Sequence, residues 1–249
     1  MVLNKICLLT ACAAIGLAGC GKNDEQRPAT LADAAAPTQA QPAPPPAPAP
    51  APKAAVARGD ASTPLQSYQE LKSGKQLMYA FLATSTLPID YEKIAGNVSS
   101  DFRYQQDEFK KRDMLSALKP AIEAEVEKAK QSRYYMMRIG NGSSGVVDKY
   151  DFAQKQFAIP DFKESDSYRY FNDVSDYKLG FSNARAFSSL NVPDENAART
   201  IESLRSTHQP LSLLVYFFAS ETELGENKLK GEIMKVQLVD KQGAVLAQQ

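Results

Sequence analysis

Apolar residues recur at the spacing of an α-helix in two segments, residues 65–82 and residues 107–132. Glu and Lys cover the face of the second segment opposite its apolar stripe. That stripe consists of Met114, Leu115, Leu118, Ile122, Val126 and Ala129. Pro120 lies in the middle of the stripe, and proline inside a helix costs about 3 kcal/mol. The pattern therefore predicts two helices, the second kinked or broken near Lys119. A further short turn is expected over residues 89–95.

After Arg133 the pattern changes to that of β-strands. Tyr134–Ile139 and Val146–Val147 flank a glycine-rich stretch, an order that is typical of strand, turn and strand. Residues 150–159 are strand-like as well, and residues 177–190 predict a strand with a bend. Helical spacing returns only over residues 195–206, where Asp194 is in place to cap the first turn.

The most apolar stretch beyond the N-terminal region runs from Leu211 to Phe218. Because it does not alternate, it predicts a central strand that is buried on both faces. Residues 228–239 and 244–247, joined by a polar turn, predict a hairpin. Helices first and mainly antiparallel strands later predict an α+β fold, in one globular domain of residues 64–249.

The N-terminus of the chain has the layout of a secretion signal. Lys5 precedes about a dozen mostly apolar residues, from Ile6 to Leu17, fewer than the roughly 20 that a membrane-spanning helix needs. The run ends in Leu17-Ala18-Gly19-Cys20, which resembles the lipobox of bacterial lipoproteins. The resemblance implies that residues 1–19 are removed and that Cys20 carries a diacylglyceryl thioether. It also implies a fatty acyl chain such as palmitate on the new amino terminus, and two or more chains give stable attachment.

The residue after Cys20 bears on the destination of such a lipoprotein. It is Gly21 and not Asp, and in Gram-negative lipoproteins the absence of Asp there usually goes with transport to the outer membrane. In a Gram-negative cell, the resemblance therefore implies attachment at the periplasmic face of the outer membrane.

Residues 20–63 are expected to form a disordered linker behind the anchor. Their composition is Ala, Pro, Gln and scattered charge, and the densest part is 41–52. Proline removes backbone donors and favours the polyproline II conformation, and the segment lacks bulky apolar residues for a core. At about 3.1 Å per residue, the Pro-rich dozen spans on the order of 35 Å. Pro45 and Pro48 also have the spacing of a PxxP docking ligand, which is the alternative to a spacer.

Cysteine, histidine and charge counts make several chemistries improbable. Cys7 and Cys12 fall in the segment to be removed and the lipid consumes Cys20, so no free thiol or disulfide is expected. His208 is the single histidine, whereas zinc enzymes typically need two or three His or Cys ligands. The 29 basic and 29 acidic residues balance without a basic run, which disfavours nucleic-acid binding. We predict neither a metal nor a cofactor.

Carboxylates and aromatic rings gather between Asp161 and Tyr177. Such a cluster is suited to bind a sugar or a peptide, or to supply the two carboxylates of a glycosidase. It is equally typical of a solvated excursion whose rings turn into the core. A calcium loop does not fit, because no Gly stands at its sixth position. The candidate ligand-binding residues are Asp161, Asp166, Tyr168, Tyr170, Asp173 and Asp176.

Together these patterns predict a lipid-anchored envelope protein whose periplasm-facing domain acts by binding an envelope protein or the cell wall. The expected partners are thus the membrane, through Cys20, and a component of the envelope. The alternative is a hydrolase of cell-wall glycan or peptide that uses carboxylates of residues 161–176.

Overall fold

The computed structural model describes residues 56–140, 144–164 and 167–249, and these form an α+β fold of five α-helices and ten strands. The helices are α1 (Gly74–Thr84), α2 (Tyr91–Val98), α3 (Ser100–Tyr104), α4 (Glu108–Gln131) and α5 (Glu195–Ser206). The strands are β1 (Gln69–Glu70), β2 (Tyr134–Ile139), β3 (Tyr150–Asp151), β4 (Gln156–Ala158), β5 (Tyr168–Phe171), β6 (Val174–Phe181), β7 (Ser189–Asn191), β8 (Leu211–Glu223), β9 (Lys228–Asp240) and β10 (Val245–Gln248).

A seven-stranded main sheet has the order β1-β2-β8-β9-β6-β5, with β10 also paired to β9. The pairs β1–β2 and β6–β9 are parallel and the other pairs are antiparallel. A smaller antiparallel sheet has the order β3-β4-β7. No helix in the described ranges is both long and apolar enough to cross a bilayer. The predicted α+β class with a mainly antiparallel sheet is confirmed.

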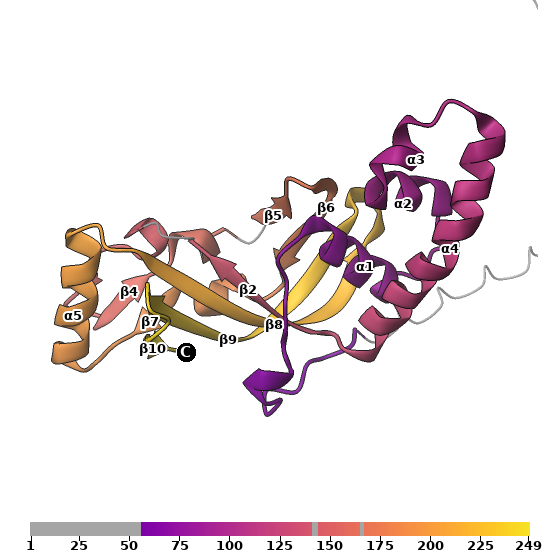
Figure 1. The fold of residues 1–249 in the computed structure, drawn as a ribbon. Coiled ribbons are helices and arrows are strands. Elements are labelled where there is room, and N and C mark those ends of the chain that lie inside the picture. The colour runs from indigo at the N-terminus through magenta and orange to yellow at the C-terminus, as the bar shows by residue number, and fades with distance from the viewer. Residues whose placement is uncertain (1–55, 141–143, 165–166) are drawn as a thin grey trace, which may run out of the picture. The chain divides into compact units, whose positions relative to one another are not determined.

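The long β8–β9 hairpin is the centre of the main sheet. Its strands pair from Leu211 opposite Asp240 to Glu223 opposite Lys228. Because β9 has 13 residues, its free side has room for two neighbours, β6 beside residues 228–231 and β10 beside residues 237–239. Figure 1 shows α1 to α4 gathered toward one end of this hairpin and α5, β4 and β7 at the other. The hairpin therefore links the two ends of the fold.

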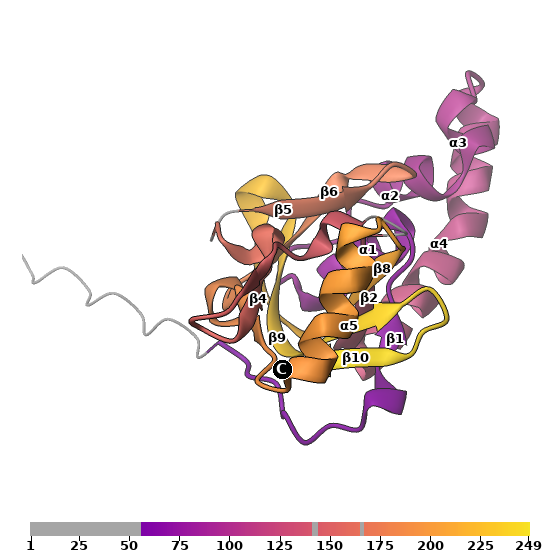
Figure 2. The ribbon, with the colours of Figure 1, turned by 90° about the vertical axis from the view of Figure 1, so that its left-hand side faces the viewer.

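One face of the main sheet carries the core. Along β8 the alternate residues Leu211, Leu213, Val215 and Phe217 are fully buried on this face. At one end they meet α1, which is covered in turn by α4. At the other end the small sheet and α5 complete the same cluster, and α5 lies beside β10 (Figure 2). All of these contacts belong to a single hydrophobic cluster.

The other face of the sheet is crossed by residues 58–68, which we call the N-terminal strap. The Arg58 guanidinium lies 3.0 Å from the Glu232 carboxylate, and the Asp60 amide donates to the Tyr134 hydroxyl at 2.8 Å. A Cβ on Gly59 would lie only 2.7 Å from that of Phe218, so a side chain there would force the strap away. The chain thus joins the sheet from Arg58 onward, ahead of the boundary expected at residue 64.

Several predicted elements are confirmed. Helix α4 begins after Asp107, whose carboxylate accepts from two first-turn amides, and it runs without interruption through Pro120. The break expected near Lys119 is therefore not found. Helix α5 has the predicted bounds and the predicted cap at Asp194. Strand β2 and the β9–β10 hairpin also lie where the pattern placed them, and β8 begins at Leu211 as expected but runs on past Phe218 to Glu223.

Three element predictions need correction. The helix expected over 65–82 begins only at Gly74, because residues 65–67 form a 3-10 turn, β1 follows, and the Ser73 hydroxyl then caps the helix. Val146 is the last residue of a 3-10 turn, where its side chain is buried. The strand expected there beside β2 is not found, since the neighbours of β2 in the sheet are β1 and β8. The strand expected over 177–190 is two strands separated by a 3-10 turn, 184–187.

Candidate functional site

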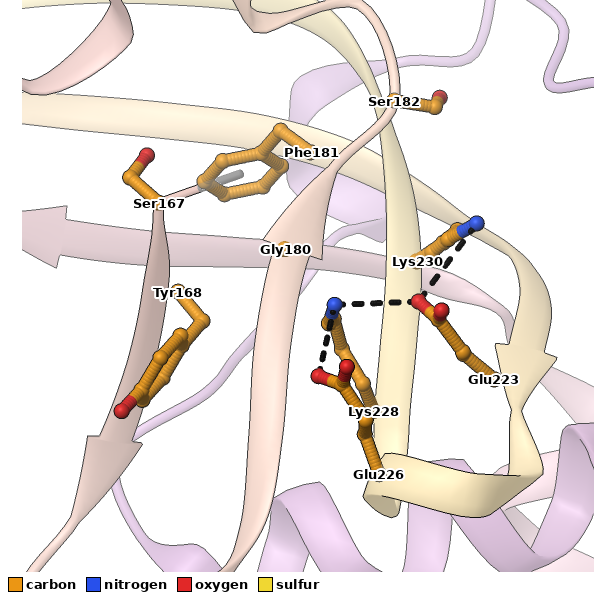
Figure 3. Close-up of a pocket in the computed structure, with 9 residues that line it drawn as sticks. All are labelled: Ser167, Tyr168, Gly180, Phe181, Ser182, Glu223, Glu226, Lys228 and Lys230. Atoms are coloured by element: carbon orange, nitrogen blue, oxygen red, sulfur yellow. Dashed lines mark ion pairs between the residues drawn. The ribbon is translucent and has the colours of Figure 1, made fainter. Parts of the chain in front are cut away.

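A slot of about 570 Å³ opens between β5, β6 and the turn of the β8–β9 hairpin. Its lining consists of Ser167, Tyr168, Gly180, Phe181, Ser182, Glu223, Glu226, Lys228 and Lys230. Leu229 and Gly231 pack into the core, so the alternate residues Lys228 and Lys230 project from the opposite face. Figure 3 shows Tyr168 on one side of Gly180 and the charged side chains on the other. We call this cavity the Tyr168–Lys228 slot.

One wall of the slot is a lattice of ion pairs. The Lys228 ammonium lies 3.0 Å from a carboxylate oxygen of Glu223 and 3.0 Å from one of Glu226. Lys230 lies 3.7 Å from the same Glu223 oxygen and 3.5 Å from Glu221. The Lys228 side chain is only 14% exposed, so its position is fixed by packing as well as by charge. The dashed lines in Figure 3 mark the pairs of Glu223 and Glu226.

These pairs fix the charge of the wall. Hydrogen bonds to Glu226 and then to Glu223 raise the pKa of the Lys228 ammonium above its ordinary value. The hydrogen bond from Lys228, followed by the charges of Lys230 and Lys228, lowers the pKa of the Glu223 carboxyl. Both pKa values thus move away from neutrality, whereas a general acid or base works best with a pKa near the operating pH. The wall is suited to hold a ligand and poorly suited to transfer a proton.

The opposite wall is aromatic. Tyr168 lies opposite Gly180 in the β5–β6 register and is 49% exposed. The Lys178 ammonium lies 4.5 Å from the centroid of the Tyr168 ring, a cation–π contact. A Cβ on Gly180 would lie 3.2 Å from Cδ of Lys228, so the aliphatic stem of Lys228 packs beside Gly180 on the floor of the slot. The half-exposed ring of Tyr168 and this lysine stem thus line the same cavity.

Two of the predicted site carboxylates have structural partners instead. The Asp161 carboxylate lies 2.7 Å from the Arg169 guanidinium on β5. The Asp173 carboxylate accepts from the backbone amides of Gly74 at 2.8 Å and Lys75 at 3.3 Å, and so binds the N-terminus of α1. Asp161 therefore makes an ion pair within the 161–176 region, and Asp173 ties this region to α1.

The remaining candidates divide between the slot and its surroundings. Tyr168 lines the slot, whereas Tyr170 is exposed two residues further along β5 and lies outside the lining. Asp176 is exposed on β6. Asp166, like Cys20, lies outside the described residues. Of the five candidates that the structure describes, it brings one, Tyr168, into the slot.

Sequence reasoning did not identify the charged wall. Its residues alternate along both strands of the hairpin, as Glu221 and Glu223 before the turn and Lys228 and Lys230 after it. Every second residue on each strand thus carries the same charge, and the charges of the two strands are opposite. Such a pattern in the sequence indicates one charged face of a hairpin. It was missed because the apolar run predicted β8 to end at Phe218, five residues too early.

A second cavity, of about 430 Å³, lies between α5 and β3 and is lined mainly by Tyr150, Phe152, Ala198, Arg199 and Glu202. His208 lies in neither cavity and follows α5 in the left-handed conformation, with a φ of 56°. Within the described ranges, no three His, Cys, Asp or Glu side chains are grouped as metal ligands. The slot is therefore the better candidate for polar recognition.

Comparison of the chain with protein-family models, with curated proteins and with solved structures gives no match. Any function must therefore be argued from the residues and the geometry of the slot.

Proposed function

We propose that this protein is a lipid-anchored accessory protein of the bacterial envelope that binds a cell-wall component in the Tyr168–Lys228 slot. The observation that carries the binding role is the ion-pair lattice of Lys228, Glu223 and Glu226, which lines a cavity with fixed charge. Its size falls in the range of about 300–1,000 Å³ that is typical of ligand pockets. A protein partner would instead be expected to cover a broad surface. The proposed anchor rests on the lipobox resemblance at Cys20.

The structure gives the alternative, a hydrolase acting through carboxylates of residues 161–176, no specific support. A glycosidase needs two carboxylates that face one bound sugar. Asp161 and Asp173 are instead engaged by Arg169 and by the amides of α1. We therefore favour binding over hydrolysis.

Membrane fractionation tests the anchor. The parent chain should remain with the membranes, and Cys20→Ser should release it to the soluble fraction because no thioether can form. If the Cys20→Ser chain stays in the membrane pellet after a high-salt wash, the proposed lipid attachment is wrong.

Co-sedimentation with purified peptidoglycan sacculi tests the binding role separately. The Cys20→Ser chain should pellet with the sacculi, and Lys228→Met should weaken this association by removing the central charge of the wall. Lys241→Met, in the exposed β9–β10 turn, is the matched control and should pellet like the parent. Failure of the parent to pellet would refute cell-wall binding, and release of soluble fragments would favour the hydrolase instead.

A further inference from the structure

We propose that the Tyr168–Lys228 slot takes a neutral saccharide unit, with the apolar face of the sugar ring on Tyr168 and its hydroxyl groups toward the ion pairs. This inference rests on the proposed function, since it names the ligand class for the same site. It follows from the charge balance of the wall, from the half-exposed aromatic ring and from the cavity that both line.

The charge balance disfavours ions. Three ammonium groups, Lys178, Lys228 and Lys230, border the slot or its ring, and three carboxylates, Glu221, Glu223 and Glu226, are interleaved with the last two. An anion in the slot meets carboxylates beside Lys228 and Lys230, and a cation meets the two ammonium groups beside those carboxylates. A neutral ligand is repelled neither by the carboxylates nor by the ammonium groups.

The same lattice suits hydroxyl groups. A hydroxyl donates one hydrogen bond and accepts others, so it can donate to a carboxylate while it accepts from an ammonium. Hydrogen bonds to ionised partners are stronger than those between neutral groups. Neighbouring hydroxyls on a sugar ring present such donors and acceptors side by side. The Ser167 and Ser182 side chains add further hydroxyls at the rim.

The aromatic wall supplies the contact that a purely polar site lacks. Tyr168 is half exposed on β5, an edge strand of the main sheet, and lies opposite Gly180. A sugar ring carries C–H groups on one face, and covering the phenol ring with them removes apolar surface from water.

Saturation-transfer NMR on the Cys20→Ser chain provides the test. The probes are three neutral oligosaccharides, tri-N-acetylchitotriose, maltotriose and cellotriose, and one anionic comparison, trigalacturonate. At least one neutral trisaccharide should bind, and raising the salt concentration should weaken it little, since no net charge is neutralised. Tyr168→Ala should weaken that binding about tenfold or more. Tyr104→Ala, at an exposed tyrosine in α3 outside the slot, is the matched control and should bind like the parent.

The outcomes separate this inference from the proposed function. If the parent chain pellets with sacculi in a Lys228-dependent way but binds none of the neutral trisaccharides, the ligand class is wrong and the binding role stands. Stronger binding of trigalacturonate than of any neutral probe would also overturn it. So would binding that Tyr168→Ala leaves unchanged. If neither sacculi nor any probe is bound, the proposed function fails as well.

Discussion

Substitution of two glycines by alanine should change stability in opposite directions. A Cβ on Gly231 would lie 2.7 Å from Cδ2 of Phe217 and 3.1 Å from Cδ1 of Phe181. Phe217 is fully buried between Phe181 and Tyr135, so its ring has no free space to move into. Overpacking of this kind costs about 1–3 kcal/mol. The lower chain entropy of unfolded alanine offsets about 0.5–1 kcal/mol of that cost, which leaves a net destabilisation of up to about 2.5 kcal/mol.

The matched control is Gly96 in α2, where an added Cβ meets no atom within 4 Å. Alanine in a helix interior is favoured over glycine by about 0.8–1 kcal/mol, so Gly96→Ala should stabilise the fold by up to that amount. Urea denaturation of the Cys20→Ser chain measures both variants, and the urea dependence should keep its slope. If Gly231→Ala is as stable as its parent, or if both variants shift in the same direction, the tight packing argued for the core is wrong.

Three further predictions concern other parts of the fold. Asp173→Ala should lower the free energy of unfolding by about 1 kcal/mol, because two first-turn amides of α1 lose their acceptor. Asp176→Ala, the control, should change the urea midpoint little. Neither substitution should alter sacculus binding. Burial raises the pKa values of Tyr135 and Tyr177 to about 12. As the pH rises, these tyrosines ionise in the unfolded chain before they ionise in the folded one, so the free energy of unfolding should fall between pH 10 and about 12. Tyr→Phe at either position should reduce that loss, which alkaline denaturation curves measure. Pro120→Ala should stabilise α4 by up to about 3 kcal/mol, since it restores a backbone hydrogen bond, and a lower thermal midpoint for this variant would contradict that reasoning.

Local signals were sufficient for the elements that carry their own start and stop residues. Helices α4 and α5 begin at Asp107 and Asp194, and each of these carboxylates accepts from amides only two or three residues away. The buried strand β8 was recognisable because its apolar run is long enough to stand out in one window of sequence. In each case the deciding interaction lies within a few residues of the element itself.

Elements fixed by distant partners were not predictable in this way. The start of α1 at Gly74 depends on Asp173, 99 residues further along the chain, as well as on the local cap. Nothing near Val146 shows that its apolar side chain packs in the core from a 3-10 turn. Local spacing therefore predicted a first helix that begins too early, at residue 65, and a strand at Val146–Val147 that the described residues do not form.

The slot was predictable only in part for the same reason. Tyr168 was identified from the density of aromatic residues around it. Its approach to Lys228 depends on β6, which pairs with β5 on one side and in parallel with β9 on the other. A parallel pairing between strands so far apart in the sequence leaves no local pattern, so the residues of the charged wall could not be assigned to the same site.

The position of the β8–β9 hairpin along the chain sets the order in which the fold can be completed during synthesis. Chains emerge from the ribosome with the N-terminus first, so α1 and α4 appear before the sheet that they cover. Strand β2 must wait for its antiparallel partner, because Tyr134 pairs with Phe218, and β6, which already has β5 beside it, gains its parallel partner only when residue 231 has been made. The main sheet therefore cannot be completed until most of the chain has been made.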